Sequence, residues 1–414
     1  MAAASRSPAA SPSTELELFN EDQYDDILLR LPPQRPKLLV RFALVSPVWR
    51  RILADPGFHR RYREYHRLPP MVGYVLNSQE SRHRLASFVS TATPPFSARV
   101  PRNGVHLVTV DSRHGRVLFL NLAGGNEDDW TIIVWDPISD HHQEVRMPAK
   151  FPSYILGYTA AVLCDVKYCD HKTCHGGPFR VVLVGVDGWP GGEWDTSALV
   201  YTSTSDAWTA SPAGFATNVN DDDDWGFCDD APAVLLGRAL YFLSSMGRIL
   251  LYDFGTEAER LTYIDVPANY IGNKARGAVL MPAADGNLGM AALLSDSTGA
   301  RILVWEREVS AAGDVHWVEM ARIRMWWGAK LIGLAVNEAF FIRTARGGVR
   351  SFNLGSGRIV DILPPPEGGK SYRGIVPFHS FDIQAGPSQA SDGNDAKEDA
   401  TTAATSKTGP DLLR

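Results

Sequence analysis

This chain of 414 residues contains only four cysteines. So few thiols cannot form the disulfide framework that holds many secreted proteins together, which predicts a reducing compartment. No run of about eighteen apolar residues occurs, so we expect no membrane-spanning helix. The N-terminal stretch lacks the apolar segment of a secretory signal, and the chain has no Asn-X-Ser/Thr glycosylation acceptor. These absences together predict an intracellular protein of the nucleus, the cytoplasm or both.

Recognisable catalytic motifs are absent as well. The sequence has no P-loop, GxGxxG, HExxH or GxSxG pattern, and no spacing of Asp and His singles out an acid–base pair. The formal net charge of -6 gives no support to general binding of nucleic acid. We therefore expect a protein that is not an enzyme, needs no cofactor, and binds neither nucleic acid nor membrane.

What is present is an ordinary globular composition, with 44% hydrophobic and 21% charged residues. A chain of this length exceeds what one small core normally spans. Ala, Ser and Pro dominate the N-terminus, and the C-terminal stretch has no aromatic residue. We predict four segments: a disordered leader (1–14), a helical domain (15–68), a large β domain (70–383) and a disordered tail (384–414).

The helical segment has prolines at places that divide it into short helices. Pro32 and Pro33 end a first helix that covers roughly 20–31. Ser46–Pro47 and Asp55–Pro56 have the order of an N-cap followed by the first helical residue. We therefore predict three further helices, which begin near residues 37, 47 and 56.

From Met71 onward, hydrophobic residues alternate with a period of two, in short runs separated by Gly, Pro, Asp and Asn. No stretch of ten residues shows helical periodicity, so a parallel βαβ sheet is not expected. A unit in which a strand ends in an aromatic residue and Asp or Glu recurs about every 40–55 residues, the length of a four-stranded propeller blade. We therefore predict a β-propeller of about six blades. A large β-sandwich is the alternative, but it gives no reason for the recurring aromatic–Asp turn.

The order of residues in the helical segment resembles a known module. The matching residues are Ile27-Leu28-Leu29-Arg30-Leu31-Pro32, Leu38-Leu39, Leu44-Val45-Ser46 with Trp49-Arg50, and Asp55-Pro56 with Phe58. Residues 19–58 resemble an F-box, the short helical module that docks onto the Skp-type adaptor of a cullin ubiquitin ligase. The whole ordered chain is similar to a large plant family, in which an F-box precedes a β-propeller-like associated region. The downstream VWDP and CDHKTCHGGPFRVVLVGVD segments fit the same family.

This resemblance implies a substrate-recognition subunit of a Skp–cullin–F-box ubiquitin ligase. Its partners would be a Skp-type adaptor, through it a cullin, and a target protein that the sequence does not identify. A module this short cannot bury all its apolar residues internally, so some are expected to contact the adaptor. We predict the adaptor-binding residues to be Ile27, Leu28, Leu31, Pro32, Leu38, Leu39, Val45 and Trp49. Trp49 is expected chiefly to hold the third helix to the others.

Two other functions remain open at this point. The helices could simply cap a ligand-binding or enzymatic propeller, whose catalytic residues would converge from distant blades. The chain could also be a scaffold that works without the adaptor, because its first helix departs from the family pattern. Phe19–Asn20 stands where the family usually has Leu-Pro, and Pro47 where a basic residue is common.

One cluster has the residue types of a metal site. Its members are Cys164, Cys169, His171, Cys174 and His175. Thiolate and imidazole are ligands of tetrahedral zinc, but the paired C-X2-C spacing of most zinc motifs is missing. We expect these residues to lie in a loop between strands, with the cysteines as small apolar residues and zinc binding as the alternative. Cys228 is distant in sequence and could be a further ligand or part of the core.

Three further groups are more simply explained by structure than by function. Asp221–Asp224, Asp229 and Asp230, beside Trp225 and Phe227, predict a solvated acidic loop rather than a cation or peptide site. At least one of Trp326 and Trp327 is expected in the core. The basic residues Arg60, Arg61 and Arg63 are expected on a solvated helix face.

Overall fold

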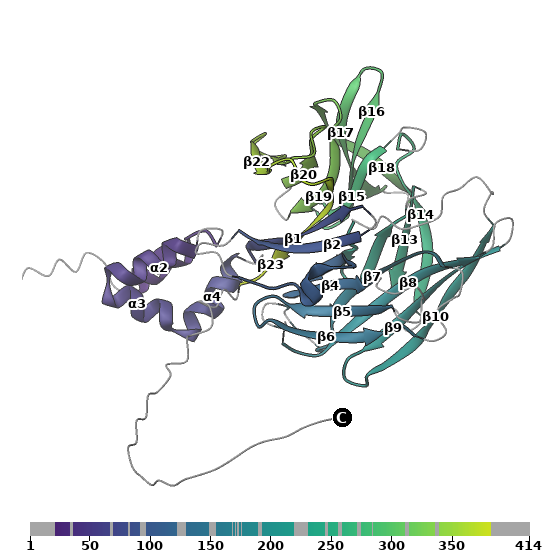
Figure 1. Cartoon of the computed structure of the whole chain (residues 1–414). Helices are drawn as coiled ribbons and strands as arrows, with labels where there is room; N and C mark the ends of the chain where they lie inside the picture. Colours follow the sequence, from purple (N-terminus) through teal and green to yellow (C-terminus); the bar gives the residue numbers. More distant parts are fainter. Residues whose placement is uncertain are drawn as a thin grey trace, which may run out of the picture. The chain divides into compact units, whose positions relative to one another are not determined.

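A computed structural model of the chain describes residues 21–381 apart from 34–35, 67–68, 82, 92–96, 122–129, 149–154, 168, 170, 172–173, 175, 189–192, 219–230, 245–246, 256–258, 271–274, 284, 311–313 and 336–338. The predicted leader (1–14) and tail (384–414) lie outside the described residues. The described part consists of a helical segment followed by a series of β-sheets (Figure 1). The predicted domain boundaries stay predictions.

The helical segment holds four helices: α1 (Glu21–Leu29), α2 (Pro36–Val45), α3 (Pro47–Ala54) and α4 (Pro56–His66). The last three each begin with a proline, whose φ angle suits the first helical turn and whose missing N–H is not needed there. The predicted helix starts are therefore correct to within one residue. α1 ends two residues before the predicted end at residue 31, in a turn where Leu31 N–H donates to Leu28 O.

The two predicted N-caps differ in their hydrogen bonds. The Asp55 carboxylate accepts bonds from the backbone N–H of Gly57 (3.0 Å) and Phe58 (3.1 Å), as an N-cap does. Ser46 has the extended backbone of an N-cap, with φ −135° and ψ 130°, but its side chain makes no cap hydrogen bond. Pro47 at the first position is therefore what marks the start of α3.

The strands form six antiparallel sheets, which we number as blades 1–6. Blade 1 contains β1 (Met71–Glu80), β2 (His83–Ser90) and β23 (Lys370–His379); a short 3-10 helix (Pro101–Gly104) follows β2. Blade 2 contains β3 (Leu107–Arg113), β4 (Arg116–Asn121), β5 (Thr131–Asp136) and β6 (His141–Arg146). Blade 3 contains β7 (Ile155–Cys164), β8 (Phe179–Gly188), β9 (Glu193–Thr202) and β10 (Ala207–Asn218).

Blades 4 to 6 repeat the same up-and-down order. Blade 4 contains β11 (Val234–Leu236), β12 (Ala239–Leu243), β13 (Arg248–Asp253) and β14 (Arg260–Asp265). Blade 5 contains β15 (Ala275–Pro282), β16 (Leu288–Asp296), β17 (Gly299–Val309) and β18 (Val315–Met325). Blade 6 contains β19 (Lys330–Ala335), β20 (Ala339–Arg343), β21 (Val349–Asn353) and β22 (Ile359–Leu363). The described chain is thus a six-bladed β-propeller preceded by a helical segment, which confirms the predicted fold.

The sequence repeat corresponds to the turn between the third and fourth strands of a blade. Asp136, directly after Trp135 at the end of β5, accepts hydrogen bonds from the N–H groups of Ile138 (2.9 Å) and Ser139 (3.3 Å). Asp253 and Asn353 occupy the same place in β13 and β21 and also accept backbone bonds from their turns. The aromatic residue before each of them, such as Trp135, is buried. The pair thus anchors the strand and closes the turn.

Blade 1 joins the two ends of the β region. β23 pairs antiparallel with β1 over the whole strand, from Met71 opposite His379 to Glu80 opposite Lys370. Strands at one edge of neighbouring blades also contact one another: β3 meets β7, β15 meets β19, and β23, the edge strand of blade 1, meets both β19 and β3. This arrangement completes the ring.

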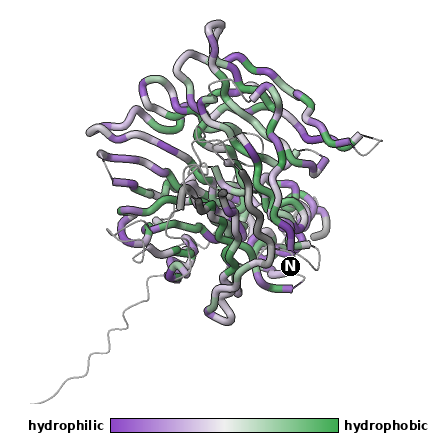
Figure 2. Tube along the Cα trace, turned by 90° about the vertical axis from the view of Figure 1, so that its right-hand side faces the viewer, coloured by the Kyte–Doolittle hydropathy of each residue, from purple (hydrophilic) through white to green (hydrophobic). Residues whose placement is uncertain are grey.

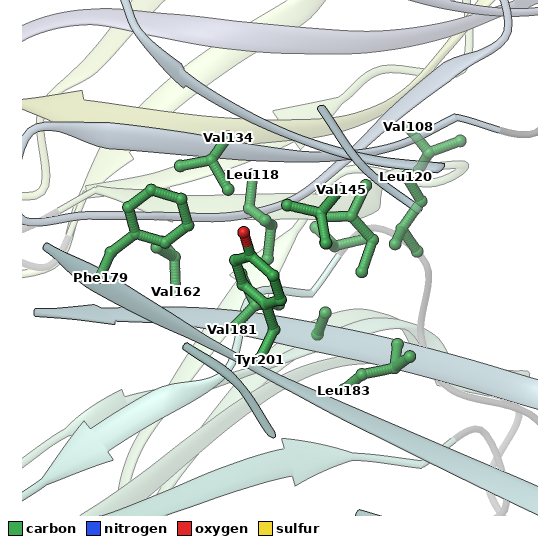
Figure 3. Close-up of a cluster of buried hydrophobic side chains, with 13 residues drawn as sticks. Val108, Leu118, Leu120, Val134, Val145, Val162, Phe179, Val181, Leu183 and Tyr201 are labelled. Carbon is green, nitrogen blue, oxygen red and sulfur yellow. The ribbon is translucent and has the colours of Figure 1, made fainter. Parts of the chain in front are cut away.

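The core lies between neighbouring blades, where apolar side chains of facing sheets pack together. In Figure 2 the hydrophobic residues concentrate in the middle of the trace. Figure 3 shows one such cluster, in which Phe179 and Tyr201 of blade 3 pack against Leu118 and Val134 of blade 2. Each blade therefore needs its neighbours to bury its faces.

Buried polar groups also tie the blades together. The Asn77 side-chain amide in blade 1 donates to Thr109 O (2.8 Å), and its oxygen accepts from Thr109 N–H (2.9 Å) in blade 2. Asp111 accepts a bond from Val162 N–H (2.8 Å) in blade 3 and pairs with Arg113 at 2.9 Å. These pairings satisfy groups that would be costly to bury alone.

Among the described residues, no helix combines the length and the apolar character needed to cross a membrane.

We predict that closure of the ring weakens in acid through His379, the last residue of β23. Burial lowers the pKa of this histidine from its usual 6.5 to about 4. The unfolded chain therefore takes up a proton that the folded chain does not, and stability is lost as pH falls from 6.5 toward 4. In urea unfolding of the full chain, His379→Gln should remove about 1.4 kcal/mol of this loss per pH unit. His316→Gln, at an exposed histidine of β18, is the control; a wild-type slope in His379→Gln would contradict the prediction.

Candidate functional site

The helical segment, residues 21–66, has a small core of its own. Leu28 of α1 and Phe58 and Tyr62 of α4 are buried, and side chains from all four helices pack around them. The Tyr62 hydroxyl donates to Leu31 O (2.8 Å), and burial raises its pKa. Arg61 of α4 forms an ion pair with Asp25 of α1 at 2.6 Å. The four helices thus form a packed unit.

The predicted adaptor-binding residues fall into two groups in this unit. Leu28 is fully buried, so it supports the helices from inside and has no surface to offer a partner in this conformation. Trp49 packs edge-on against Phe42, with ring centroids 4.7 Å apart, as expected for a residue that holds α3 in place. The other half-buried members are Leu31, Leu38 and Leu39. Pro32, Ile27 and Val45 are exposed.

The most exposed apolar side chains of the helices lie together at the end of α2. Leu44 is 73% exposed and Val45 is 75% exposed. Burying such side chains against a partner would contribute about 1.5–3 kcal/mol each. Leu44 belongs to the matching motif, but we did not predict it as a contact, because a sequence pattern does not show which leucines fill the internal core.

A pair of alanine substitutions separates the core of the helices from their exposed surface. Leu28→Ala should destabilise the helical segment by about 2–5 kcal/mol, because it leaves a cavity beside Phe58 and Tyr62. Val45→Ala removes an exposed side chain and should change stability by less than about 0.5 kcal/mol. Hydrogen exchange of the α1 and α4 amides in the full chain measures both effects. Equal protection in the two variants would show that Leu28 is not a core residue.

A second site is formed by the cysteine–histidine cluster. Cys164 ends β7, while Cys169, His171 and Cys174 lie in the connection to β8. The four ligand atoms all lie within 4.8 Å of one another, and Cys174 Sγ is 3.8 Å from His171 Nδ1. The structure therefore brings together four of the five predicted residues. His175 and Cys228 lie outside the described residues.

The neighbouring strand β4 and the turn before it support this cluster. The His114 ring stacks on the His171 ring, with centroids 4.2 Å apart and an interplanar angle of 10°. His114 Nδ1 accepts a hydrogen bond from Cys164 N–H at 3.1 Å. Arg116, only 2% exposed, donates to Cys174 O (2.7 Å) and to Gly177 O. His114 and Arg116 lie about 50 residues before the cysteines in another blade, so sequence spacing gives no sign that they contact the cluster.

The electrostatics of the cluster disfavour bare charges. Burial, and after it the neighbouring sulfur of Cys164, raise the pKa of the Cys174 thiol to about 12. Burial, followed by the charge of His171 and the two neighbouring arginines, lowers the pKa of His114 to about 3. Burial also lowers the pKa of Arg116, while Cys174 and Cys164 oppose that effect. Without a bound cation, the surroundings of the cluster therefore favour neutral thiols beside the buried guanidinium of Arg116.

A groove of about 470 Å³ lies beside the cluster, between blades 2 and 3. Arg116 and Gly177 line it on one side, and Val134 and Phe179, labelled in Figure 3, also line it. Further lining residues carry hydrogen-bonding side chains: Asp136, Ser139, His141, Gln143, Ser203 and Thr204. Such a mixture of apolar surface and convergent polar groups suits recognition of a ligand or peptide.

The remaining predicted groups have simpler surroundings. Trp326 packs against the core between blades 5 and 6, with Arg350 5.4 Å from its ring centroid, whereas Trp327 is 66% exposed. We predicted at least one of the two tryptophans in the core; Trp326 is half-buried and packs against the core from its edge. Arg60 and Arg61 are exposed, as expected of a solvated helix face, although Arg61 is also paired with Asp25. Arg63 is half-buried, so for this residue the prediction was wrong. The acidic stretch at 221–224, with Asp229, Asp230, Trp225 and Phe227, lies outside the described residues.

Comparison with known proteins gives a weak sequence match and structural matches with low TM-scores. No family model matches the chain. A curated protein of Arabidopsis thaliana that is named as an F-box protein is 28% identical over 141 residues, which are 32% of this chain. The match spans only 34% of that relative's length.

Among solved structures, the fucose-specific lectin of Aleuria aurantia covers 73% of this chain with a TM-score of 0.38 and 11% identity. A complex of BBS1N with ARL6DN covers 71% of the chain with a TM-score of 0.31 and 11% identity. The chain covers 99% of the lectin chain and 76% of the other.

Proposed function

We propose that this chain is the substrate-recognition subunit of a Skp–cullin–F-box ubiquitin ligase. Its helical segment would bind the Skp-type adaptor, and its propeller would bind the target protein. The observation that carries this proposal is a helical unit with its own core that still exposes Leu44 and Val45 at the end of α2. The similarity to a protein named as an F-box protein supports the same assignment.

The exposed side chains have the chemistry that a helical docking partner requires. Affinity at such interfaces comes from a few buried apolar anchors, not from catalytic groups. Leu44, Val45 and Ile27 are accessible for this purpose, and Pro32 is exposed in the turn after α1. Leu28, Phe58 and Tyr62 hold the helices beneath them in place.

On this proposal the protein is a non-catalytic receptor in the nucleus or the cytoplasm. It raises the effective concentration of the target near a ubiquitin-charged enzyme that the adaptor and cullin bring to it. The groove between blades 2 and 3 is a candidate place for the target, because polar side chains such as His141, Ser203 and Thr204 line it beside the apolar Val134 and Phe179.

A pull-down of the full chain with a Skp-type adaptor tests the proposal. We expect Leu44→Asp with Val45→Asp to lower the affinity for the adaptor by at least about 100-fold, because two apolar contacts are lost and two charges are added. Val309→Asp with Val315→Asp is a matched control at exposed valines of β17 and β18, and it should bind like the wild type. Failure of the intact chain to bind an adaptor that captures a known F-box would overturn the proposal.

A ligand-binding propeller with a helical cap is the second candidate, and the polar groove favours it. In that case His141→Ala would abolish binding of a small molecule, while the Leu44→Asp with Val45→Asp variant would bind it like the wild type. Proximity labelling with and without residues 1–50 separates the two functions. For a ligase receptor, truncation should remove the adaptor and cullin from the labelled set and leave the targets.

A further inference from the structure

The connection between β7 and β8 differs from an ordinary hairpin loop. The two strands pair directly, with Cys164 opposite Phe179, yet fourteen residues, 165 to 178, join them. Hairpin loops of two to five residues are usual, so a connection of this length is uncommon and needs its own source of order. Cys169, His171 and Cys174 all lie within it.

We propose that Cys164, Cys169, His171 and Cys174 bind one Zn²⁺ ion as a structural site. This proposal concerns the β domain and does not depend on the function of the helices. All four positions of a tetrahedral ion would be filled by protein ligands, which leaves no open position for water or substrate. The site would therefore hold the loop in place and would not catalyse a reaction.

The distances suit a tetrahedral ion. Two sulfurs bound to one zinc lie about 3.8 Å apart, given a Zn–S bond of about 2.3 Å. The separation of Cys174 Sγ from His171 Nδ1 is 3.8 Å, and every pair among the four ligand atoms is within 4.8 Å. The ligands are thus nearly placed, and shifts of about 1 Å or less would complete the coordination.

Backbone donors point at two of the sulfurs. The N–H of Val166 donates to Cys164 Sγ, and the N–H of His171 donates to Cys169 Sγ, each at 3.4 Å. In both cases the donor lies two residues after the cysteine. Hydrogen bonds of this kind reduce the charge on a thiolate and orient it toward a metal.

Groups from blade 2 supply the outer part of the site. The His114 ring covers one face of the His171 ring, and its Nδ1 fixes the backbone N–H of Cys164. Outer partners of this kind orient metal ligands. Arg116 is buried beside Cys174 and hydrogen-bonds to its carbonyl oxygen. Three thiolates and one neutral imidazole on Zn²⁺ carry a net charge of about −1, which one guanidinium can offset.

The ligand set selects the metal and defines the proton balance. Thiolate ligands favour zinc over hard cations such as calcium and magnesium. The three thiols lose their protons to solvent on binding, and His171 binds as the neutral imidazole. No electron is transferred, so the step needs no oxidant or reductant.

The proposed ion would also shape the groove. Gly176, Gly177 and Pro178 begin two residues after Cys174 and line the groove between blades 2 and 3. Fixing Cys174 therefore fixes that wall. A ligand that binds in the groove would therefore contact a loop whose conformation the bound metal has already fixed.

Elemental analysis of the full chain, purified under reducing conditions from zinc-supplemented cells, tests the proposal. We expect about one zinc per chain, and a tetrahedral sulfur–nitrogen spectrum when Co²⁺ replaces it. Cys169→Ser and Cys174→Ser should each lower the zinc affinity by at least about 100-fold, the upper end of the effect of losing an outer partner. Cys228→Ser, at the fourth cysteine, is the matched control and should retain the metal.

A second measurement keeps the test valid if a variant misfolds. Chelation of zinc from the wild-type chain should accelerate tryptic cleavage after Lys167, an exposed residue of the loop, by at least about 10-fold. A folded wild type with neither zinc nor a tetrahedral cobalt spectrum would overturn the proposal. The same zinc content in Cys174→Ser and the wild type would mean that the ion is adventitious. A disulfide within the cluster, with no metal bound, would mean that the cysteines are a redox pair. Either result would also overturn the proposal.

Discussion

The pairing of β23 with β1 is the constraint on which the rest of the β domain depends. It brings a strand from the end of the domain against the strand that begins it, and it pairs an edge that would otherwise be open. Closing so long a chain segment has an entropic cost that grows slowly with length. Burial on both faces of blade 1 offsets this cost, because Phe378 packs with Trp135 of blade 2 and Ile375 with Phe341 of blade 6. Without this pairing, blades 2 and 6 would each lose a neighbour.

A closed ring of this kind leaves function to its loops and to the grooves between blades. The β7–β8 connection is the clearest case in the described part of the chain. It carries three of the four clustered sulfur and nitrogen ligands and lines the adjoining groove. Because Arg116 and His114 reach it from blade 2, the loop is held by the neighbouring blade as well as by its own strands.

Unlike the propeller, the helical segment has too small a core to bury all of its apolar side chains. Four helices of eight to eleven residues cannot form a large core, and among the helix residues whose burial the structure describes, three side chains are buried in the shared cluster. The apolar residues that the core cannot accommodate stay on the surface, as Leu44 and Val45 do. A small unit with a minimal core and exposed apolar side chains is suited to binding a partner.

The sequence alone was sufficient for the local structure. Prolines at residues 32, 33, 47 and 56 and the period of two after Met71 predicted the helices and strands, because backbone geometry and alternation are short-range properties. The aromatic–Asp turn predicted the blades for the same reason. The sequence also shows the residue types of the cysteine–histidine cluster, but it does not show that their side chains lie close together.

Only the tertiary structure decided which parts meet. It buried Leu28 and exposed Leu44, two leucines of one motif that the pattern cannot distinguish. It placed His114 and Arg116 against the cysteine loop and β23 beside β1. These outcomes depend on contacts between residues far apart in the chain, which arise when the ring closes and which no local pattern specifies.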